Sequence, residues 1–375
     1  MNLKRTIKDH IKNYIFKGKI ITIYGPRQVG KTTLVNEIAK AYGEYGYFSC
    51  DEPDVRDKLT NKTSFELKQF LGHNKLVIID EAQRVENIGI TLKLLIDNYP
   101  ETQIIATGSS SFELANKIKE ALTGREVAFH LHPFTFLELS QLYQTLDLYR
   151  QKEERMIFGM YPDVVLEKTI PKEKMLSLIS NEYLYKDLLS YEGIRKPMLL
   201  EKLARLLATQ TGSLISFSEL ANTLDVSKQT VENYIKILEQ AFIIFSILPY
   251  SENVRSELTK KRKIYFYDTG VRSALLENTT MLDRRIDTGF LFENMIISER
   301  VKYLSNQARN VKFYFWRTHD GQEIDLIEIE QNQKRAFEIK WQKPTNYKTP
   351  PKWKNNYPNI PVTLIHKDNF LDYLL

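Results

Sequence analysis

The chain has 375 residues, enough for two or three domains, and its 42% apolar and 27% charged content is ordinary for a globular protein. A formal net charge of +6 permits contact with nucleic acid without requiring it. The single cysteine, Cys50, excludes an internal disulfide and favours a reducing compartment. The longest apolar run, 241–248, is too short to span a bilayer, and the N-terminus lacks the apolar core of a signal peptide. We therefore expect a cytoplasmic protein with no membrane partner.

Residues 20–34, IITIYGPRQVGKTTL, hold the pattern G-x-x-x-x-G-K-[ST] between a β-branched run and an amphipathic segment. The glycines allow backbone conformations that a Cβ would hinder, and the N–H groups of the loop can surround phosphate oxygens. Lys31 would reach the β- and γ-phosphates, and the hydroxyl of Thr32 would ligate Mg²⁺. The pattern predicts a nucleoside triphosphate site formed by Gly25, Pro26, Arg27, Gln28, Val29, Gly30, Lys31, Thr32 and Thr33.

A second signal is the apolar run 76–79, which is followed directly by Asp80 and Glu81. A buried parallel strand would deliver both carboxylates at its C-terminal end. We predict that Asp80 holds Mg²⁺ through water and that Glu81 polarises the attacking water. An ordinary capped strand end has the same composition, but a position about fifty residues behind the phosphate loop favours catalysis.

The next strand, 103–108, ends in small polar residues and is expected beside the first strand. Either Thr107 or Ser109 could then sense the γ-phosphate. Arg125, after a glycine turn, could stabilise transition-state charge in cis or across a subunit boundary of a homo-oligomer. An exposed arginine with no catalytic role fits the same position equally well.

Several segments together resemble prokaryotic AAA-type ATP-binding proteins that carry a C-terminal domain of unknown function. They are GPRQVGKTTL, VIIDEAQ, ATGSSS, LTGRE, HLHPFTFLEL, GMYPDVVLE, YLYKDLL, KIYFYDTGVRSALL, GFLFEN and EIDLIEIE with AFEIKW. The resemblance covers nearly the whole chain and implies ATP and Mg²⁺ as ligands. It also implies an ATPase core at 1–135 and a small helical lid at 136–212.

Residues 216–235 predict a helix-turn-helix in which Ser227 caps the second helix. Two strands, within 241–250 and 263–267, would complete a winged domain at 213–267. The side chains expected to face a DNA groove are Lys228, Gln229, Thr230, Asn233 and Lys236. The basic run 260–263 could meet phosphates. A winged helix that serves only as a lid or spacer fits the pattern as well.

The last part, 268–375, predicts an amphipathic helix at 289–303 followed by strands near 311–316, 323–328, 335–341 and 361–365. Glu293 on the helix, Asp325, and the Glu338-x-Lys340 segment resemble the core of PD-(D/E)xK nucleases. This resemblance implies Asp325 and Glu338 as ligands of a second divalent metal, and Lys340 and Glu293 as further catalytic residues. Two acids and a lysine also arise by chance on an exposed hairpin.

The whole is expected to be an α/β chain: a P-loop NTPase parallel sheet with a helical lid, a winged helix-turn-helix and a C-terminal restriction-endonuclease-like domain. Three functions remain open. The first is an ATPase that controls a nucleic-acid-facing C-terminal module. The second is an ATP-regulated metal-dependent DNA endonuclease, and the third is a nucleotide-gated switch with an inactive nuclease fold.

Overall fold

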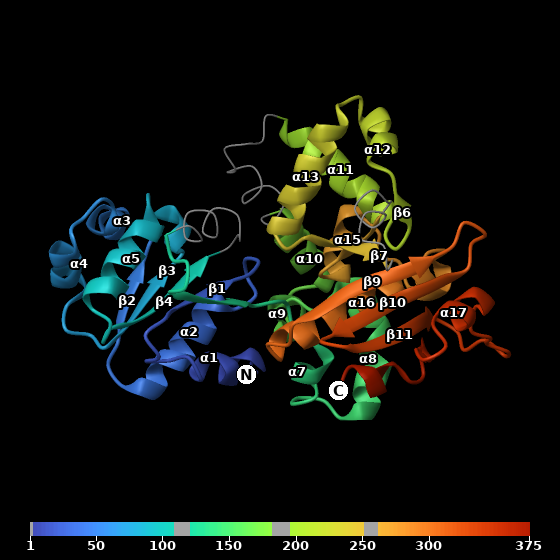
Figure 1. The fold of residues 1–375 in the computed structure, drawn as a ribbon, viewed down its shortest axis with the longest axis horizontal. Coiled ribbons are helices and arrows are strands. Elements are labelled where there is room, and N and C mark those ends of the chain that lie inside the picture. The colour runs from blue at the N-terminus through green and yellow to red at the C-terminus, as the bar shows by residue number, and fades with distance from the viewer. Residues whose placement is uncertain (1–2, 109–120, 182–195, 251–261) are drawn as a thin grey trace.

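Two β-sheets organise the residues that the computed structural model describes, which are 3–108, 121–181, 196–250 and 262–375 (Figure 1). The first sheet has the strand order β2-β3-β4-β1-β5, and all of its pairings are parallel. The second sheet has the order β12-β11-β10-β9-β7-β8-β6 and mixes parallel with antiparallel pairs. The molecule is therefore a mixed α/β protein with one fully parallel sheet and one mixed sheet.

The N-terminal half alternates strands and helices. Its elements are α1 (Ile7–Lys12), β1 (Ile20–Tyr24), α2 (Lys31–Ala39), β2 (Gly46–Ser49), α3 (Pro53–Leu59), α4 (Ser64–Leu71), β3 (Leu76–Asp80), α5 (Ile88–Asn98), β4 (Gln103–Gly108) and β5 (Glu126–His130). Strand β4 pairs with β1, as predicted. Because the strands are parallel, β1, β3 and β4 all end at one edge of the sheet, where side chains that follow them can meet.

Helices dominate the middle of the chain: α7 (Phe136–Leu139), α8 (Thr145–Phe158), α9 (Pro162–Leu166), α10 (Lys172–Asn181) and α11 (Pro197–Thr209). The end of α8 lies tightly against α15 (Thr269–Leu275). A Cβ on Gly270 would lie 2.2 Å from the carbonyl oxygen of Phe158, and Met160 N donates to Asp268 Oδ2 over 2.7 Å. The helices expected as a lid are thus anchored on the C-terminal half.

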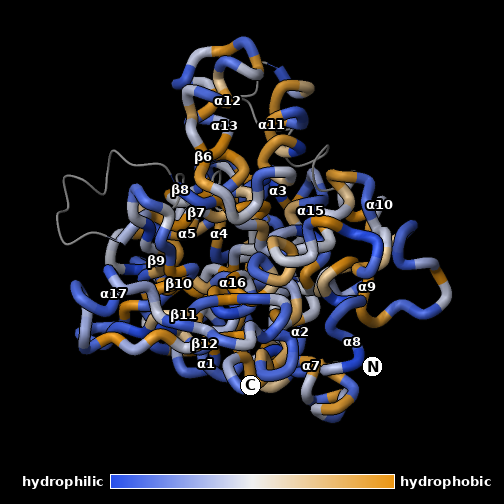
Figure 2. The backbone as a smooth tube through the Cα atoms, turned by 90° about the vertical axis from the view of Figure 1, so that its right-hand side faces the viewer, coloured by the Kyte–Doolittle hydropathy of each residue, from blue (hydrophilic) through white to orange (hydrophobic). Residues whose placement is uncertain are grey.

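Helices α12 (Phe217–Leu224) and α13 (Lys228–Gln240) form the predicted pair, joined by a short turn. Ser227 caps α13 by accepting a hydrogen bond from Thr230 N, as its position in the sequence predicts. The side chains of Leu220, Val231 and Ile235 are buried between the helices and their neighbours. With α11, this pair projects from the rest of the molecule in both views (Figures 1 and 2).

The remaining elements build the second sheet and its covering helices. They are β6 (Leu214–Ile215), β7 (Ile244–Pro249), β8 (Arg262–Phe266), α16 (Thr288–Asn306), β9 (Val311–Arg317), β10 (Glu323–Glu330), β11 (Gln333–Lys340), α17 (Pro351–Asn356) and β12 (Val362–His366). Strand β7 pairs antiparallel with β8 and parallel with β9. The two strands predicted as a wing therefore continue into the C-terminal sheet, across the boundary expected between residues 267 and 268.

The main apolar core runs through both halves of the chain, from Ile7 and Ile21 to Phe292 and Leu374. No helix in the described ranges has the length and apolar character needed to cross a membrane.

Candidate functional sites

The phosphate loop lies between β1 and α2, as the sequence predicts. A Cβ on Gly25 would lie 2.1 Å from the carbonyl oxygen of Leu131, so only glycine fits there without moving backbone. Gly30 precedes α2 with φ of +89°, a conformation that also favours glycine. The buried Lys31 ammonium donates to the carbonyl oxygens of Gly25 (2.9 Å) and Pro26 (2.8 Å). The loop thus encloses the lysine that is expected to contact phosphates.

Three hydroxyl groups converge on the carboxylate of Asp80. Thr32 Oγ1 donates to Oδ2 over 2.8 Å, Tyr47 OH donates to the same oxygen over 2.6 Å, and the Thr107 hydroxyl donates to Oδ1. Burial, followed by the contact with Asp80, raises the pKa of the Tyr47 hydroxyl, which keeps it a donor. Residues from β1–α2, β2, β3 and β4 therefore meet at one carboxylate.

Glu81 follows directly after β3 and has a left-handed backbone, with φ of +54°. Its N–H donates to Thr107 Oγ1 over 3.0 Å, and its carboxylate accepts from Gln83 Nε2 over 2.6 Å. A non-glycine residue held in this conformation carries local strain of a kind that clusters at functional sites. Thr107 contacts both acids of the pair. The alternative sensor, Ser109, lies outside the described residues.

The oxygen donors beside the loop fit Mg²⁺. A nucleotide-bound Mg²⁺ takes one or two protein oxygens and completes its shell with phosphates and water. Thr32 and Asp80 supply a hydroxyl and a carboxylate that already contact each other. When bound with nucleotide, Mg²⁺ would offset the negative charge of the phosphates.

Arg125 lies away from this site. Its carbonyl oxygen accepts from Ile20 N at the beginning of β1, whereas the phosphate loop follows the end of that strand. Its guanidinium forms an ion pair with Asp97 over 2.6 Å. Within one chain Arg125 is thus at the opposite edge of the sheet from the loop, and the prediction that it acts there in cis is not supported. A contribution across a subunit boundary stays a prediction.

The four residues predicted for the C-terminal site come together with two others. Lys340 Nζ lies 2.7 Å from Glu338 Oε1 and 3.5 Å from Asp325 Oδ2. Lys263 belongs to β8, and its Nζ lies 3.2 Å from Glu293 Oε1, 2.5 Å from Glu323 Oε1 and 3.9 Å from Asp325 Oδ1. We call this group the acid–lysine cluster; its members are Lys263, Glu293, Glu323, Asp325, Glu338 and Lys340.

The position of Lys263 contradicts one expectation from the sequence. It was grouped with the basic run 260–263 as a contact for phosphates, but its side chain is only 3% exposed and is surrounded by carboxylates. Burial opposes its charge, yet the neighbouring Glu293, Asp325 and Glu323 raise its pKa above the usual value. Lys263 is therefore a fixed internal cation. Lys260 and Lys261 lie outside the described residues.

Two carboxyl groups of the acid–lysine cluster hold protons more tightly than usual. Burial, and then the charge of Asp325, raises the pKa of Glu338 to about 7. Burial also raises the pKa of Glu293 to about 7, although Lys263 opposes the shift. Protonation of these groups limits the negative charge that the two lysines must balance.

This arrangement does not fit a divalent metal. A divalent ion on the oxygens that face Lys263 would lie about 4 Å from the ammonium, and the repulsion between these two charges is about 8 kcal/mol for an effective dielectric constant of about 20. Among the described residues, no three or more His, Cys, Asp or Glu side chains are arranged to hold a metal ion. The predicted ligation of metal by Asp325 and Glu338 is therefore not supported.

Arg5 connects the phosphate loop to the segment that follows β5. Its buried guanidinium donates to Val29 O (2.7 Å), His132 O (2.5 Å) and Glu138 Oε1 (3.0 Å). The same segment contacts α16, the helix that carries Glu293. Lys302 Nζ donates to Phe134 O over 3.1 Å, and Phe136 N donates to Glu299 Oε2 over 2.8 Å. A continuous series of polar contacts thus joins the loop to α16.

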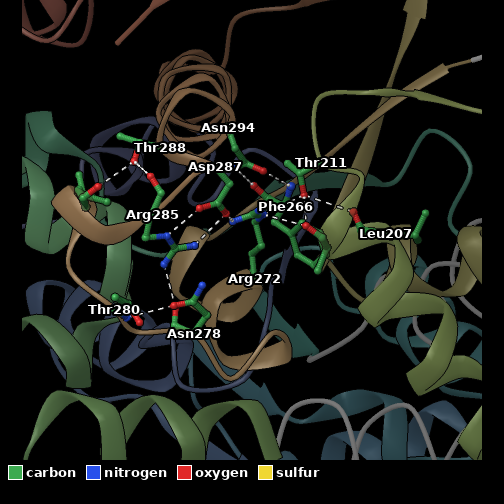
Figure 3. A network of polar contacts seen from close by, with 12 residues as sticks. Leu207, Thr211, Phe266, Arg272, Asn278, Thr280, Arg285, Asp287, Thr288 and Asn294 are labelled. Carbon is green, nitrogen blue, oxygen red and sulfur yellow. Dashed lines mark hydrogen bonds and ion pairs between the residues drawn. The ribbon is translucent and has the colours of Figure 1, made fainter. Parts of the chain in front are cut away.

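A second polar network fixes the beginning of α16 (Figure 3). Asp287 accepts from both Arg272 and Arg285 over 2.8 Å. Burial opposes the charge of Asp287, but the hydrogen bonds from these two arginines hold its pKa at about 2. Asn294 pairs with the backbone of Phe266 on β8 through both its amide oxygen and nitrogen. Helix α16 is thereby fixed to the strand that carries Lys263.

Sequence reasoning missed Arg5, Tyr47 and the role of Lys263. Arg5 stands among basic residues that look solvated, and Tyr47 lies in a short strand with no motif. Lys263 had a usable signal: the three residues after it, Ile264, Tyr265 and Phe266, form an uninterrupted apolar run, as expected for a strand buried on both faces.

The fold and the loop geometry define the N-terminal part as a P-loop domain, and comparison with known families agrees. Residues 17–140 match the family model of the AAA domain. Residues 149–282 and 288–368 match two domains of unknown function, DUF8612 and DUF4143. The chain therefore carries an AAA-type P-loop ATPase domain followed by a DUF4143 domain.

Two relatives that resemble most of this chain are described as uncharacterized proteins. The chain is 26% identical over 343 residues to one from Mycobacterium tuberculosis, which covers 90% of this chain and 74% of the relative. It is 26% identical over 335 residues to one from Methanocaldococcus jannaschii, covering 78% and 70%. A solved Walker-type ATPase of Pyrococcus abyssi superposes with a TM-score of 0.49 at 14% identity, covering 73% of this chain and 96% of that one.

Proposed function

We propose that this protein binds ATP with Mg²⁺, hydrolyses it, and uses the nucleotide state to control its C-terminal module. The observation that carries the proposal is the hydrogen bond from Thr32 Oγ1 to Asp80 Oδ2, because it joins the loop residue and the strand-end acid that share Mg²⁺ in ATPases. Loop residues 25–33 would surround the phosphates, with Lys31 on the β- and γ-phosphates. Thr107 would sense the γ-phosphate, and Glu81 would accept a proton from the attacking water.

Phosphate release at saturating ATP tests the assignment. Glu81→Gln should retain ATP binding and lose about 100-fold in turnover, since general-base catalysis contributes about that much or more. Lys31→Ala should lose both binding and turnover. Glu86→Gln and Lys40→Ala change exposed residues near each position and serve as matched controls. Unchanged turnover in either site variant would contradict the assignment. Retained nucleotide with negligible wild-type turnover would favour the nucleotide-gated switch.

The contacts of Arg5 support control of the C-terminal module. A nucleotide that orders the loop acts on Val29, which Arg5 ties to residues 132–138, and these residues contact α16. Helix α16 in turn carries Glu293. Nucleotide state should therefore alter α16, and hydrogen exchange of its amides with and without ATP would measure this. Identical exchange in both states would contradict the coupling.

The α12–α13 pair with strands β7 and β8 supports the winged-helix interpretation, with nucleic acid as the partner. Lys228, Gln229, Asn233 and Lys236 are exposed on α13. Lys236→Ala should weaken duplex DNA binding and reduce the salt slope by about one. The exposed Lys174 on α10 provides the control substitution. Equal slopes for both variants would instead favour a lid or spacer role.

Cleavage of nucleic acid is the second candidate, because Glu293, Asp325, Glu338 and Lys340 converge as in a restriction-endonuclease-like domain. Such cleavage requires a divalent metal, and the ammonium of Lys263 would repel that metal. DNA products formed with Mg²⁺ or Mn²⁺ should vanish in Asp325→Ala and Lys340→Ala if the module cleaves. Products that persist in both variants would come from a contaminant.

A further inference from the structure

The acid–lysine cluster contains a cation supplied by the chain itself. Lys263 enters from β8, outside the α16–β10–β11 group that provides the predicted nuclease residues. Its ammonium lies within 3.9 Å of carboxylate oxygens from Glu293, Glu323 and Asp325. A single ammonium thus contacts acids from both α16 and β10, as a bound metal ion would.

The position of Lys263 is fixed from several sides. The neighbouring strand residue Tyr265 donates to Glu293 Oε1 over 2.6 Å, on the oxygen that also faces Lys263. Asn294, next to Glu293, holds the backbone of Phe266 by two hydrogen bonds. Lys263 also lies 5.7 Å from the centre of the Phe315 ring. These contacts hold β8 against α16 and so keep Lys263 beside the acids.

The second lysine of the cluster differs in exposure. The side chain of Lys340 is 47% exposed, whereas that of Lys263 is 3% exposed. An exposed ammonium can rotate into water when a competing cation arrives, but a buried one has no solvent to enter. Exclusion of metal by the cluster therefore depends on Lys263.

We propose that Lys263 is the resident cation of the acid–lysine cluster and keeps divalent metal out of it. The surrounding carboxylates are oxygen donors of the type that Mg²⁺ and Mn²⁺ prefer, and Lys263 occupies their shared side. Replacing Lys263 by a small neutral residue removes the repulsion and leaves a cavity lined by acids. The wild-type acids, all within the described part of the chain, are not arranged to hold a metal ion, and we expect those released from Lys263 in the variant to rearrange around a divalent cation.

Mn²⁺ titration of the nucleotide-free full chain, followed by the electron paramagnetic resonance of free Mn²⁺, tests the proposal. Wild type should show no site at the cluster, and Lys263→Ala should gain one with at least tenfold tighter binding. The gain should vanish in Lys263→Ala/Asp325→Asn and persist in Lys263→Ala/Asp80→Asn, which separates the cluster from the nucleotide site. Lys312→Ala, at an exposed position on β9, controls for loss of a lysine.

Thermal unfolding gives a second measurement that does not depend on activity. With Asp80→Asn present to remove the nucleotide-site carboxylate, Mn²⁺ should raise the unfolding midpoint of the Lys263→Ala chain and leave that of the chain with Lys263 unchanged, because a ligand stabilises the state that binds it. Lys263→Met, which fills more of the cavity, is the alternative variant should alanine prevent folding. Wild-type Mn²⁺ binding that Asp325→Asn abolishes would overturn the proposal. Absence of binding in both lysine variants would also overturn it.

Discussion

The guanidinium of Arg5 donates a hydrogen bond to the carbonyl oxygen of Val29 over 2.7 Å, so a residue ahead of the first helix is fixed to the phosphate loop. The same group forms an ion pair with Glu138, whose side chain is fully buried. The N-terminal segment is therefore part of the nucleotide site's support. Its sequence shows no motif that would have assigned it this place.

Replacing Arg5 should lower the free energy of unfolding. Arg5→Met would leave the buried carboxylate of Glu138 without its ion-pair partner, and such a loss typically costs about 3 kcal/mol or more. Urea unfolding should show this decrease, together with weaker ATP binding. Lys4→Met removes the neighbouring exposed ion pair with Asp9 and should cost at most about 1 kcal/mol. Similar losses in the two variants would contradict a supporting role for Arg5.

Tyr47 should matter for hydrolysis although no motif contains it. Tyr47→Phe removes one of three donors to Asp80, a hydrogen bond to a charged group that is worth about 1.5 kcal/mol. We expect kcat/KM for Mg²⁺-ATP to fall about tenfold. Tyr45→Phe provides the matched control, since its hydroxyl bonds Asn36 instead. An equal effect of the two substitutions would show that Asp80 does not depend on Tyr47.

A substitution at Gly25 would test how closely the phosphate loop approaches Leu131, the residue that follows β5. Gly25→Ala would place a methyl group 2.1 Å from Leu131 O, so the loop must shift and ATP binding should fall at least tenfold. Gly43 also has positive φ, +91°, but an added Cβ there would meet nothing within 4 Å. Gly43→Ala should therefore show only the backbone strain, as a small decrease in stability with ATP affinity retained. Fluorescent nucleotide titration measures both variants.

The acid–lysine cluster should make stability depend on pH. Burial raises the pKa of Glu293 from its usual 4.5 to about 7, so the folded state keeps a proton that the unfolded state releases. Its contribution to stability is complete below pH 4.5 and is lost as pH rises through 7. Denaturant unfolding from pH 5 to 8 should show a decline that is smaller in Glu293→Gln. Glu86→Gln, at an exposed position, should retain the wild-type slope.

The N-terminal site was the part that sequence could predict, because its geometry is local. Residues 20–39 form one strand–loop–helix unit, and Asp80 ends a strand whose burial is evident from composition. Helix α13 and its cap at Ser227 were predictable for the same reason. Thr107 lies near the end of the buried strand β4, where the sequence predicts it.

Contacts between distant segments could not be predicted. Arg5 meets Glu138, and Lys263 meets Glu293 and Glu323, only once segments that are far apart in the sequence have packed together. A lysine within a basic run suggests a solvated surface unless the sheet around it is known. The sheet topology explains why Arg125 does not reach the phosphate loop of its own chain. Arg125 precedes β5, whereas the loop follows β1, and in a parallel pair these positions lie at opposite edges of the sheet.

The parallel pairing of β7 with β9 has a consequence for synthesis on the ribosome. Leu248 pairs with Tyr314, and β8, α15 and α16 are translated between them. Until β9 emerges, one edge of β7 offers unpaired N–H and C=O groups to other nascent chains. The second sheet is therefore completed only after β9 has been synthesised. A chaperone that shields this edge during translation should raise the yield of folded protein.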